Sequence, residues 1–283
     1  MTGKGRANEL LGYPADARLL IINADDFGMC HSVNEAVIRT LREGLVSSCT
    51  LMVPCPWSLH ALKLLRESPE VPFGVHLTVI SEAPDYRWGP ITCRDEVPSL
   101  TDEAGHFYSE ARSDEFLDQV DLTELEQEFR AQIETVVATG LRPTHLDSHC
   151  GPHTRRERIF DMTLRLAHEY GLALRVYGEP FVETLQTRGY PTLDHELLDS
   201  FTLETANKSA RYARMLKDLP VGLSEWAVHP GLGNAELGAV EPKQVRPTDY
   251  AFFVSQEAKE IIKEEEIIVL SYRDLQAVWN SER

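Results

Sequence analysis

The chain has 283 residues, of which 42% are hydrophobic and 26% are charged, so it is long enough to bury a core without disulfide or metal cross-links. Acidic residues outnumber basic residues by 45 to 28, which gives a formal net charge of −17. A surface of this charge repels phosphate backbones and argues against nucleic acid as a partner.

The five cysteines are odd in number and include no CxxC pair, which argues against a disulfide framework and a cysteine-built zinc site. The first 18 residues contain no apolar segment typical of a secretory signal. No apolar run approaches the roughly 20 residues needed to cross a bilayer. We therefore expect a cytoplasmic protein without a membrane span. A homodimer is compatible with the sequence, which does not determine the oligomeric state.

Short apolar runs alternate with helical patterns along most of the chain. Apolar runs bounded by turn residues predict buried strands, and apolar residues spaced i, i+3, i+4 predict helices. The expected strands are residues 18–23, 45–53, 71–79, 143–149, 172–177, 224–229 and 266–272. The expected helices are residues 32–43, 57–67, 123–139, 154–170, 205–219 and 255–264. Ser32 with Glu35, and Thr123 with Glu126, have the spacing of a capping box at a helix start.

Repeated strand–helix units are typical of a parallel sheet, and about seven strands favour an α/β fold with a single-domain irregular (β/α) barrel. We expect residues 1–17 to be an N-terminal tail and residues 18–283 to be the domain. Residues 81–113 interrupt the rhythm with three prolines and two glycines. A connection this long is often functional, so we expect a long loop at the rim of the barrel.

Ionisable side chains gather where the predicted strands end. An Asp–Asp pair follows the first strand, one histidine lies in the second half of the third strand, and three residues alternate along the fourth strand. A further histidine ends a later strand. These residues are Asp25, Asp26, His76, His145, Asp147, His149 and His229.

The carboxyl ends of parallel strands form the functional face of α/β proteins, so these side chains should meet at one rim. Two imidazoles and a carboxylate with open positions are typical of a catalytic divalent-metal site. His149, at the strand exit, is the best-placed ligand, whereas His145 and Asp147 lie deeper and can orient ligands from behind. Taken singly, Asp–Asp is typical of a turn or helix cap and His–Pro–Gly of a turn. The joint pattern favours the metal site.

Other catalytic patterns are missing from the sequence. There is no GxSxG for a serine nucleophile and no GxGxxG or GxxxxGK[ST] for a nucleotide. Cys150 adjoins His149, and we interpret it as a small buried residue rather than a nucleophile.

Five segments together resemble the YdjC-like carbohydrate deacetylases, which include chitooligosaccharide deacetylase and the hopanoid-associated deacetylases. The combination of NADDFG with THLDSH is specific, and the resemblance extends from about residue 18 to residue 277. The segments are LLIINADDFG (19–28), GVHLT (74–78), RPTHLDSH (142–149), AVHPG (227–231) and LSYRDL (270–275).

This resemblance implies an irregular (β/α) barrel that hydrolyses an N-acetyl group from a small acetamido sugar or oligosaccharide. By motif, it implies that Asp26, His76 and His149 hold one divalent metal ion. It further implies that Asp25 is the general base, that His229 is an acid or charge stabiliser, and that Arg175 lines the substrate pocket. The family's ion is magnesium, whereas two imidazoles suit zinc or another transition ion better.

The chain departs from the family pattern after THLDSH, where relatives commonly continue with more histidines. Here Cys150, Gly151 and Pro152 follow, so we expect the pocket wall beyond His149 to differ from that of the relatives. In the rim loop, Tyr86 and Trp88 are suited to stacking on sugar faces. The alternative is that these aromatic residues pack the loop onto the barrel.

Two other functions remain open at this stage. A metal-dependent phosphoesterase also uses Asp and His ligands on a barrel rim, but the net charge and the lack of a Lys/Arg cluster near the motifs argue against it. A catalytically silent sugar-binding barrel is the second. Asp25 argues against it, because a binding site needs no free carboxylate beside a ligand carboxylate.

Overall fold

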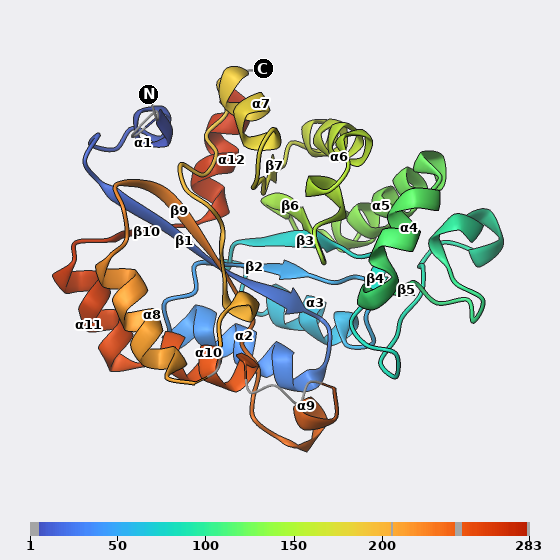
Figure 1. Ribbon diagram of the computed structural model, residues 1–283, viewed down its shortest axis with the longest axis horizontal. Helices are drawn as coiled ribbons and strands as arrows, with labels where there is room; N and C mark the ends of the chain where they lie inside the picture. Colours follow the sequence, from blue (N-terminus) through green and yellow to red (C-terminus); the bar gives the residue numbers. More distant parts are fainter. Residues whose placement is uncertain (1–5, 205, 241–244, 282–283) are drawn as a thin grey trace.

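A curled parallel β-sheet lies at the centre of the structure, a computed structural model that describes residues 6–204, 206–240 and 245–281 (Figure 1). Its strands are β1 (Arg18–Phe27), β2 (Ser48–Leu51), β3 (Phe73–Leu77), β6 (His145–Ser148), β7 (Ala173–Leu174), β8 (Leu198–Asp199), β9 (Gly222–Val228) and β10 (Ile268–Leu270). The order is β7-β6-β3-β2-β1-β9-β8, and β10 pairs with the first half of β1. Within the described residues β7 and β8 form the two open edges, so the barrel is incomplete.

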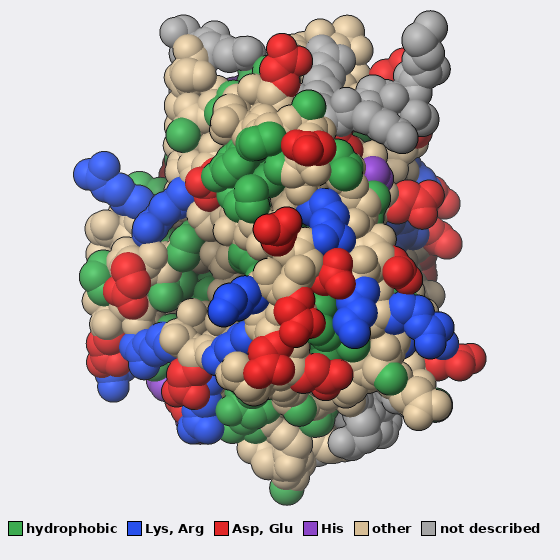
Figure 2. Space-filling view, turned by 90° about the vertical axis from the view of Figure 1, so that its left-hand side faces the viewer, with side chains coloured by type: hydrophobic (Ala, Val, Ile, Leu, Met, Phe, Trp, Pro, Cys, Tyr) green, Lys and Arg blue, Asp and Glu red, His purple; other side chains and the backbone are tan. Residues whose placement is uncertain are grey.

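Helices follow most of the strands and cover the outer side of the sheet (Figure 1). They are α1 (Arg6–Leu11), α2 (His31–Glu43), α3 (Ser58–Arg66), α4 (Ser113–Gln119), α5 (Leu122–Val137), α6 (Glu157–Tyr170), α7 (Phe181–Thr187), α8 (Lys208–Lys217), α9 (Ala235–Val240), α10 (Val245–Phe253), α11 (Gln256–Glu264) and α12 (Tyr272–Ser281). Among the described helices, none combines the length and apolar character needed to cross a membrane. On the face in Figure 2, basic side chains are interspersed with acidic ones.

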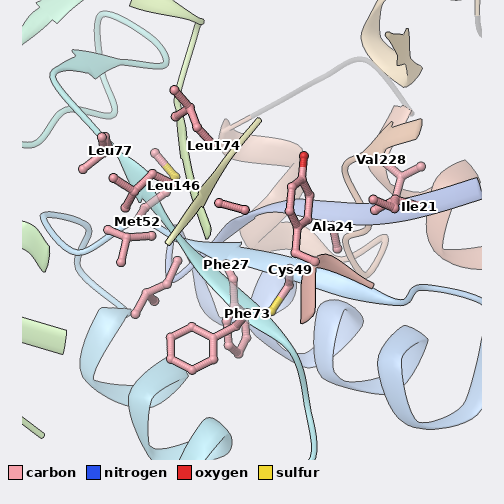
Figure 3. Packing of buried hydrophobic residues seen from close by; sticks show 14 of the residues in the cluster. Ile21, Ala24, Phe27, Cys49, Met52, Phe73, Leu77, Leu146, Leu174 and Val228 are labelled. Atoms are coloured by element: carbon pink, nitrogen blue, oxygen red, sulfur yellow. The ribbon is translucent and has the colours of Figure 1, made fainter. Parts of the chain in front are cut away.

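The burial of β1 shows that the sheet forms the core of the protein. Leu19 to Ile22 are fully buried, because both faces of a covered parallel strand pack against other layers. Figure 3 shows the apolar residues of β1, β2, β3, β6 and β9 packed together. The alternating α/β pattern of the sequence therefore produces the predicted fold, a parallel sheet curled into an irregular barrel.

The expected strands all occur, most with shorter boundaries, but β1 continues to Phe27 and β9 begins earlier, at Gly222. β8 was not expected, because two residues are too short to give a sequence pattern. The capping boxes were wrong. In the first turn of α2, the backbone amides of His31 and Ser32 donate to the carboxylate of Glu236, which is more than 200 residues away in the sequence. The start of α5 is capped by Asp121.

Two segments expected to be irregular contain regular structure. Part of the expected tail forms α1, in which the Asn8 side chain donates to the Pro14 and Ala17 carbonyls at 2.9 Å. The segment 81–113 begins at β4 (Ile80–Ser81), which pairs in parallel with β5 (Tyr108–Ser109). The segment buries its own apolar residues, Trp88, Val97, Leu100, Phe107 and Tyr108. It is therefore a folded excursion from the barrel rather than an open loop.

Gly74 allows the two histidine-bearing strands to approach each other. A Cβ at Gly74 of β3 would lie 2.6 Å from the backbone oxygen of His145 in β6. We predict that Gly74→Ala lowers the free energy of unfolding by about 1–3 kcal/mol, because the strands must separate. Urea denaturation measures this loss. Gly238→Ala is the control, because nothing lies within 4 Å of that position. Equal stability of the two variants would contradict the prediction.

Candidate active site

The carboxyl ends of three strands bring the predicted acids and histidines together. Asp25 and Asp26 lie near the end of β1, His76 lies in β3, and His149 directly follows β6. The backbone amide of His149 donates to the Leu77 carbonyl at 3.1 Å, so pairing with β3 extends one residue beyond β6. These side chains line one cavity of about 560 Å³. That volume suits a small organic ligand.

A bulge in β1 explains how two adjacent aspartates reach the same cavity. Neighbouring residues of a regular strand point to opposite faces. Here the register between β1 and β2 shifts between Ala24 and Phe27, and Asp26 has a left-handed φ of 66°. Bulges of this kind redirect side chains and are common beside active sites. The cavity is therefore lined by both Asp25 and Asp26.

Asp26, His76 and His149 form a buried cluster that can hold a metal ion. One ligand atom from each lies within 4.8 Å of the other two. Asp26 Oδ1 is 3.5 Å from His76 Nε2 and 3.2 Å from His149 Nδ1. Among the described residues, this buried oxygen receives no hydrogen bond. A carboxylate oxygen and two imidazole nitrogens converging on one point fit a divalent cation.

The remaining atoms of this cluster are held from behind. Asp147 Oδ1 is 2.7 Å from His76 Nδ1, and Glu82 Oε2 is 3.1 Å from His149 Nε2. Arg246 donates to Asp26 Oδ2 at 2.7 Å. Glu82 and Arg246 were not expected. Neither belongs to a recognisable motif, and Arg246 is 220 residues from Asp26, so no sequence signal could have identified them.

A guanidinium holds Asp25 in place. Arg175 Nη1 and Nη2 donate to the two carboxylate oxygens of Asp25 at 2.8 and 2.9 Å. Asn23 donates to the same carboxylate at 2.7 Å. Burial alone would raise the pKa of Asp25, but the charges of Arg175 and His76 outweigh it and lower the pKa. The carboxylate is therefore ionised at neutral pH.

Arg175 lines the cavity but is mainly surrounded by carboxylates. Besides Asp25, its guanidinium contacts Asp147 Oδ2 and Glu225 Oε1, each at 2.7 Å. Its side chain is only 3% exposed. The structure thus gives Arg175 a clear role in holding Asp25, while sugar contact stays a prediction.

His229 faces Asp25 from the end of β9. Its Nε2 lies 4.0 Å from Asp25 Oδ2, and its Nδ1 lies 2.8 Å from Ser200 Oγ. Its backbone amide donates to Asp249 Oδ2 at 2.8 Å. The ring also packs edge-on against Phe201. His229 is therefore fixed with one ring nitrogen directed toward the cavity.

The rim aromatic residues do not offer stacking faces in this structure. Trp88 is 3% exposed, and its indole N–H donates to the Ile80 carbonyl. The Tyr86 hydroxyl donates to the Met29 carbonyl. Neither side chain lines the cavity. The expectation that Trp88 stacks on a sugar is therefore corrected in favour of packing, since its ring lies edge-on against His149.

His145 lies beneath the site rather than in it. Its ring stacks on that of Tyr272, with centroids 3.6 Å apart, and its Nδ1 is 2.9 Å from Thr144 Oγ1. Burial lowers the pKa of His145 to about 3. His145 is therefore neutral and supports the floor of the site through packing.

The unusual segment after His149 forms a tight turn. Cys150 and Gly151 both have left-handed φ angles, 56° and 62°. The turn directs His153 inward, where its ring contacts Ser148 Oγ and its Nε2 lies 2.8 Å from the Arg175 carbonyl oxygen. Burial lowers the pKa of His153 to about 4. The departure from the expected pattern thus builds a wall of the cavity and braces the backbone of Arg175.

A second groove of about 600 Å³ lies at the opposite ends of the strands, next to Phe73 and Thr144. Its lining includes Arg142 and Arg273 but no carboxylate or imidazole side chain. The predicted acids and histidines therefore line the first cavity and not this groove.

Comparison with known proteins gives a consistent result. The family model described as "YdjC-like protein" matches residues 19–264. A carbohydrate deacetylase from Enterococcus faecalis is 33% identical over 90% of this chain and 97% of its own length. One from Brevibacillus brevis is 32% identical over 90% and 99%. A chitooligosaccharide deacetylase from Yersinia enterocolitica is 35% identical over 56% and 59%.

A solved structure shares the same architecture. It is a crystal structure of an Enterococcus faecalis protein described as a candidate for cellobiose-phosphate cleavage. The two chains are 31% identical, the TM-score is 0.78, and the match covers 92% of this chain and 99% of the other.

The buried neutral histidines predict how stability depends on pH. His145 and His153 remain unprotonated in the fold, whereas in the unfolded chain each takes up a proton below about pH 6.5. Acid therefore favours unfolding. Between about pH 6.5 and pH 5, metal-free protein should lose up to about 1.4 kcal/mol of unfolding free energy per pH unit for each of these imidazoles.

His76 contributes least toward pH 5 and slightly offsets this loss near pH 6.5. Burial lowers its pKa but Asp147 raises it more strongly, to about 9. Near pH 5 it is therefore protonated in both the folded and the unfolded chain, whereas near pH 6.5 only the folded chain keeps it fully protonated. Urea denaturation at several pH values measures the slope. His153→Gln should reduce the slope by up to about 1.4 kcal/mol per pH unit, since the proton that His153 takes up on unfolding is no longer bound. A slope of zero in the native chain would contradict the prediction.

Proposed function

Because this chain belongs to the YdjC-like family of carbohydrate deacetylases, we propose that it is a metal-dependent hydrolase that removes an N-acetyl group from a small acetamido sugar or oligosaccharide. The observation that supports this most is the buried convergence of Asp26, His76 and His149 next to an ionised Asp25. The names of the relatives, carbohydrate deacetylases, support an acetylated sugar as the class of substrate.

Asp26, His76 and His149 would hold the ion. When bound there, a divalent cation would lower the pKa of a water molecule and polarise the acetamide carbonyl. Magnesium is the ion implied by the family resemblance. The two imidazole ligands favour zinc or another transition ion.

Asp25 would accept the proton of the attacking water. Its two hydrogen bonds from Arg175 hold it ionised and in one orientation, which is the state a general base needs. His229 would donate a proton to the leaving nitrogen. Its Nε2 is directed toward the cavity, while Ser200 Oγ lies beside its other ring nitrogen. Fixed donors and acceptors of this kind align the substrate without further rearrangement.

The charge around the cavity makes a phosphoesterase the weaker candidate. Among the described lining residues there are five carboxylates and one guanidinium, that of Arg175, which already contacts three carboxylates. Apart from the proposed metal ion, a phosphate group would meet no guanidinium or ammonium group in this lining that is free of carboxylates. We therefore propose that the substrate is an uncharged or amine-bearing sugar. The carboxylates are Asp25, Asp26, Glu82, Glu110 and Asp199.

The reaction is tested by measuring acetate release. Protein loaded in turn with magnesium, zinc or manganese is incubated with N-acetylglucosamine and its short oligomers, and p-nitrophenyl phosphate is assayed in parallel. We expect acetate from at least one acetamido sugar, abolished by a chelator and restored by metal, with no phosphate release. Phosphate release without acetate from any sugar would overturn the proposal.

Replacing the paired aspartates separates their roles. Asp25→Asn should retain the metal but lower kcat by about 10²–10⁴-fold, because an amide cannot accept the proton. Asp26→Asn should instead weaken metal binding, because a neutral amide oxygen is a poorer ligand. Metal content by elemental analysis and kcat are measured on the same preparations. Equal loss of metal in both variants would contradict this division.

A further inference from the structure

Glu82 joins the excursion 81–113 to the proposed metal ligands. It directly follows β4, and the pairing of β4 with β5 fixes the backbone at this point. Its Oε2 lies 3.1 Å from His149 Nε2, and its Oε1 accepts a hydrogen bond from Arg246 Nη2 at 3.3 Å. The Glu82 side chain is 17% exposed. It is thus held between two charged groups.

Four side chains close a ring beside the cavity. Arg246 Nη2 donates to both Glu82 and Asp26, the latter at 2.7 Å. Asp26 Oδ1 in turn lies 3.2 Å from His149 Nδ1, and His149 faces Glu82. Arg246 is fully buried and comes from α10, so the ring links β1, the segment after β6, the 81–113 excursion and α10.

We propose that Glu82, acting with Arg246, is a positioning residue that fixes which atoms of His149 and Asp26 are presented to the metal ion. The proposal rests on the function proposed above. Glu82 itself acts through His149.

The reason lies in the two nitrogens of an imidazole. Which nitrogen binds a metal is set by the hydrogen bond that the other makes, commonly to a carboxylate. Glu82 Oε2 lies 3.1 Å from Nε2 of His149, near enough to attract it by charge although their geometry is not that of a regular hydrogen bond, and Nδ1 is directed at Asp26. Asp147 does the same for His76 with the nitrogens exchanged, since it lies 2.7 Å from Nδ1 and leaves Nε2 directed at Asp26. Both proposed imidazole ligands are thus supported by a carboxylate.

Arg246 orients the proposed carboxylate ligand, Asp26, in a similar way. It engages Oδ2 of Asp26 and leaves Oδ1 directed at the two histidines. Its positive charge also lies between Asp26 and Glu82, which would otherwise repel each other. The 81–113 excursion thus contributes to the proposed metal centre through Glu82, its first residue after β4.

The test measures metal affinity, with activity as a secondary readout. Glu82→Gln should weaken zinc and cobalt binding by about 10–100-fold, as is typical when a carboxylate behind a ligating histidine is lost. Glu110→Gln is the matched control. It removes the same charge from the same cavity, but Glu110 is exposed and lies outside the ring. We expect its affinity to equal that of the unmodified chain.

The visible spectrum of bound cobalt distinguishes positioning from direct ligation. At saturation, Glu82→Gln should keep the unmodified band intensity, because the coordination number is unchanged. A changed intensity would make Glu82 a ligand and overturn the proposal. Glu82→Asp should recover part of the lost affinity, and the thermal unfolding midpoint of each variant should stay near that of the unmodified chain.

Asp26→Asn separates this inference from the function on which it rests. If Asp26→Asn loses metal while Glu82→Gln binds as tightly as Glu110→Gln, the positioning role is wrong and the proposed metal site stands. If the unmodified chain binds no metal, or Asp26→Asn binds it normally, both proposals are overturned.

Discussion

The buried guanidinium of Arg175 is the interaction on which the rest of the site depends. It contacts the carboxylates of Asp25, Asp147 and Glu225, all of them buried. Burying a carboxylate without such a partner costs several kcal/mol of folding free energy, unless the carboxylate takes up a proton. The backbone of Arg175 is fixed in turn. Its amide donates to the Leu146 carbonyl, and its carbonyl oxygen lies 2.8 Å from His153 Nε2. The ionised state of Asp25 therefore depends on the backbone contacts that hold Arg175 beside β6.

Charge balance also connects the two halves of the site. Asp147 lies between Arg175 and His76, so the proposed base, which Arg175 holds, and the proposed ligand His76 share one carboxylate. On the ligand side, Arg246 lies between Asp26 and Glu82 in the same way. Against the effect of burial, Arg175 lowers the pKa of Asp25 and Asp147, and Arg246 lowers that of Asp26 and Glu82, so each guanidinium favours the ionised form of carboxylates that would otherwise repel one another. These contacts orient the side chains before any substrate binds, which lowers the cost of aligning reacting groups.

Two segments without a recognisable pattern complete the cavity. The excursion 81–113 contributes Glu82 and buries Trp88 against His149. The turn at Cys150 and Gly151 carries His153 beneath Arg175. Loops that surround a site on a rigid scaffold commonly determine what the site accepts. In this chain they also contact the charged groups, so changes in them would act on the proposed centre directly.

The sequence by itself determined the alternation of strands and helices, the parallel sheet, and the residues that its strand ends deliver, because these depend on local periodicity and on motifs such as NADDFG and THLDSH. It also indicated the cluster of Asp26, His76 and His149, whose side-chain atoms the fold brings within 4.8 Å of one another. Only the tertiary structure decided that adjacent Asp25 and Asp26 share one cavity, since a bulge and a left-handed φ at Asp26 override the alternation of a strand. Only the tertiary structure placed Arg246 and Glu82 on the ligands and Trp88 in the packing. These contacts join residues up to 220 positions apart, and the balance of buried charges that selects them has no local signature in the chain.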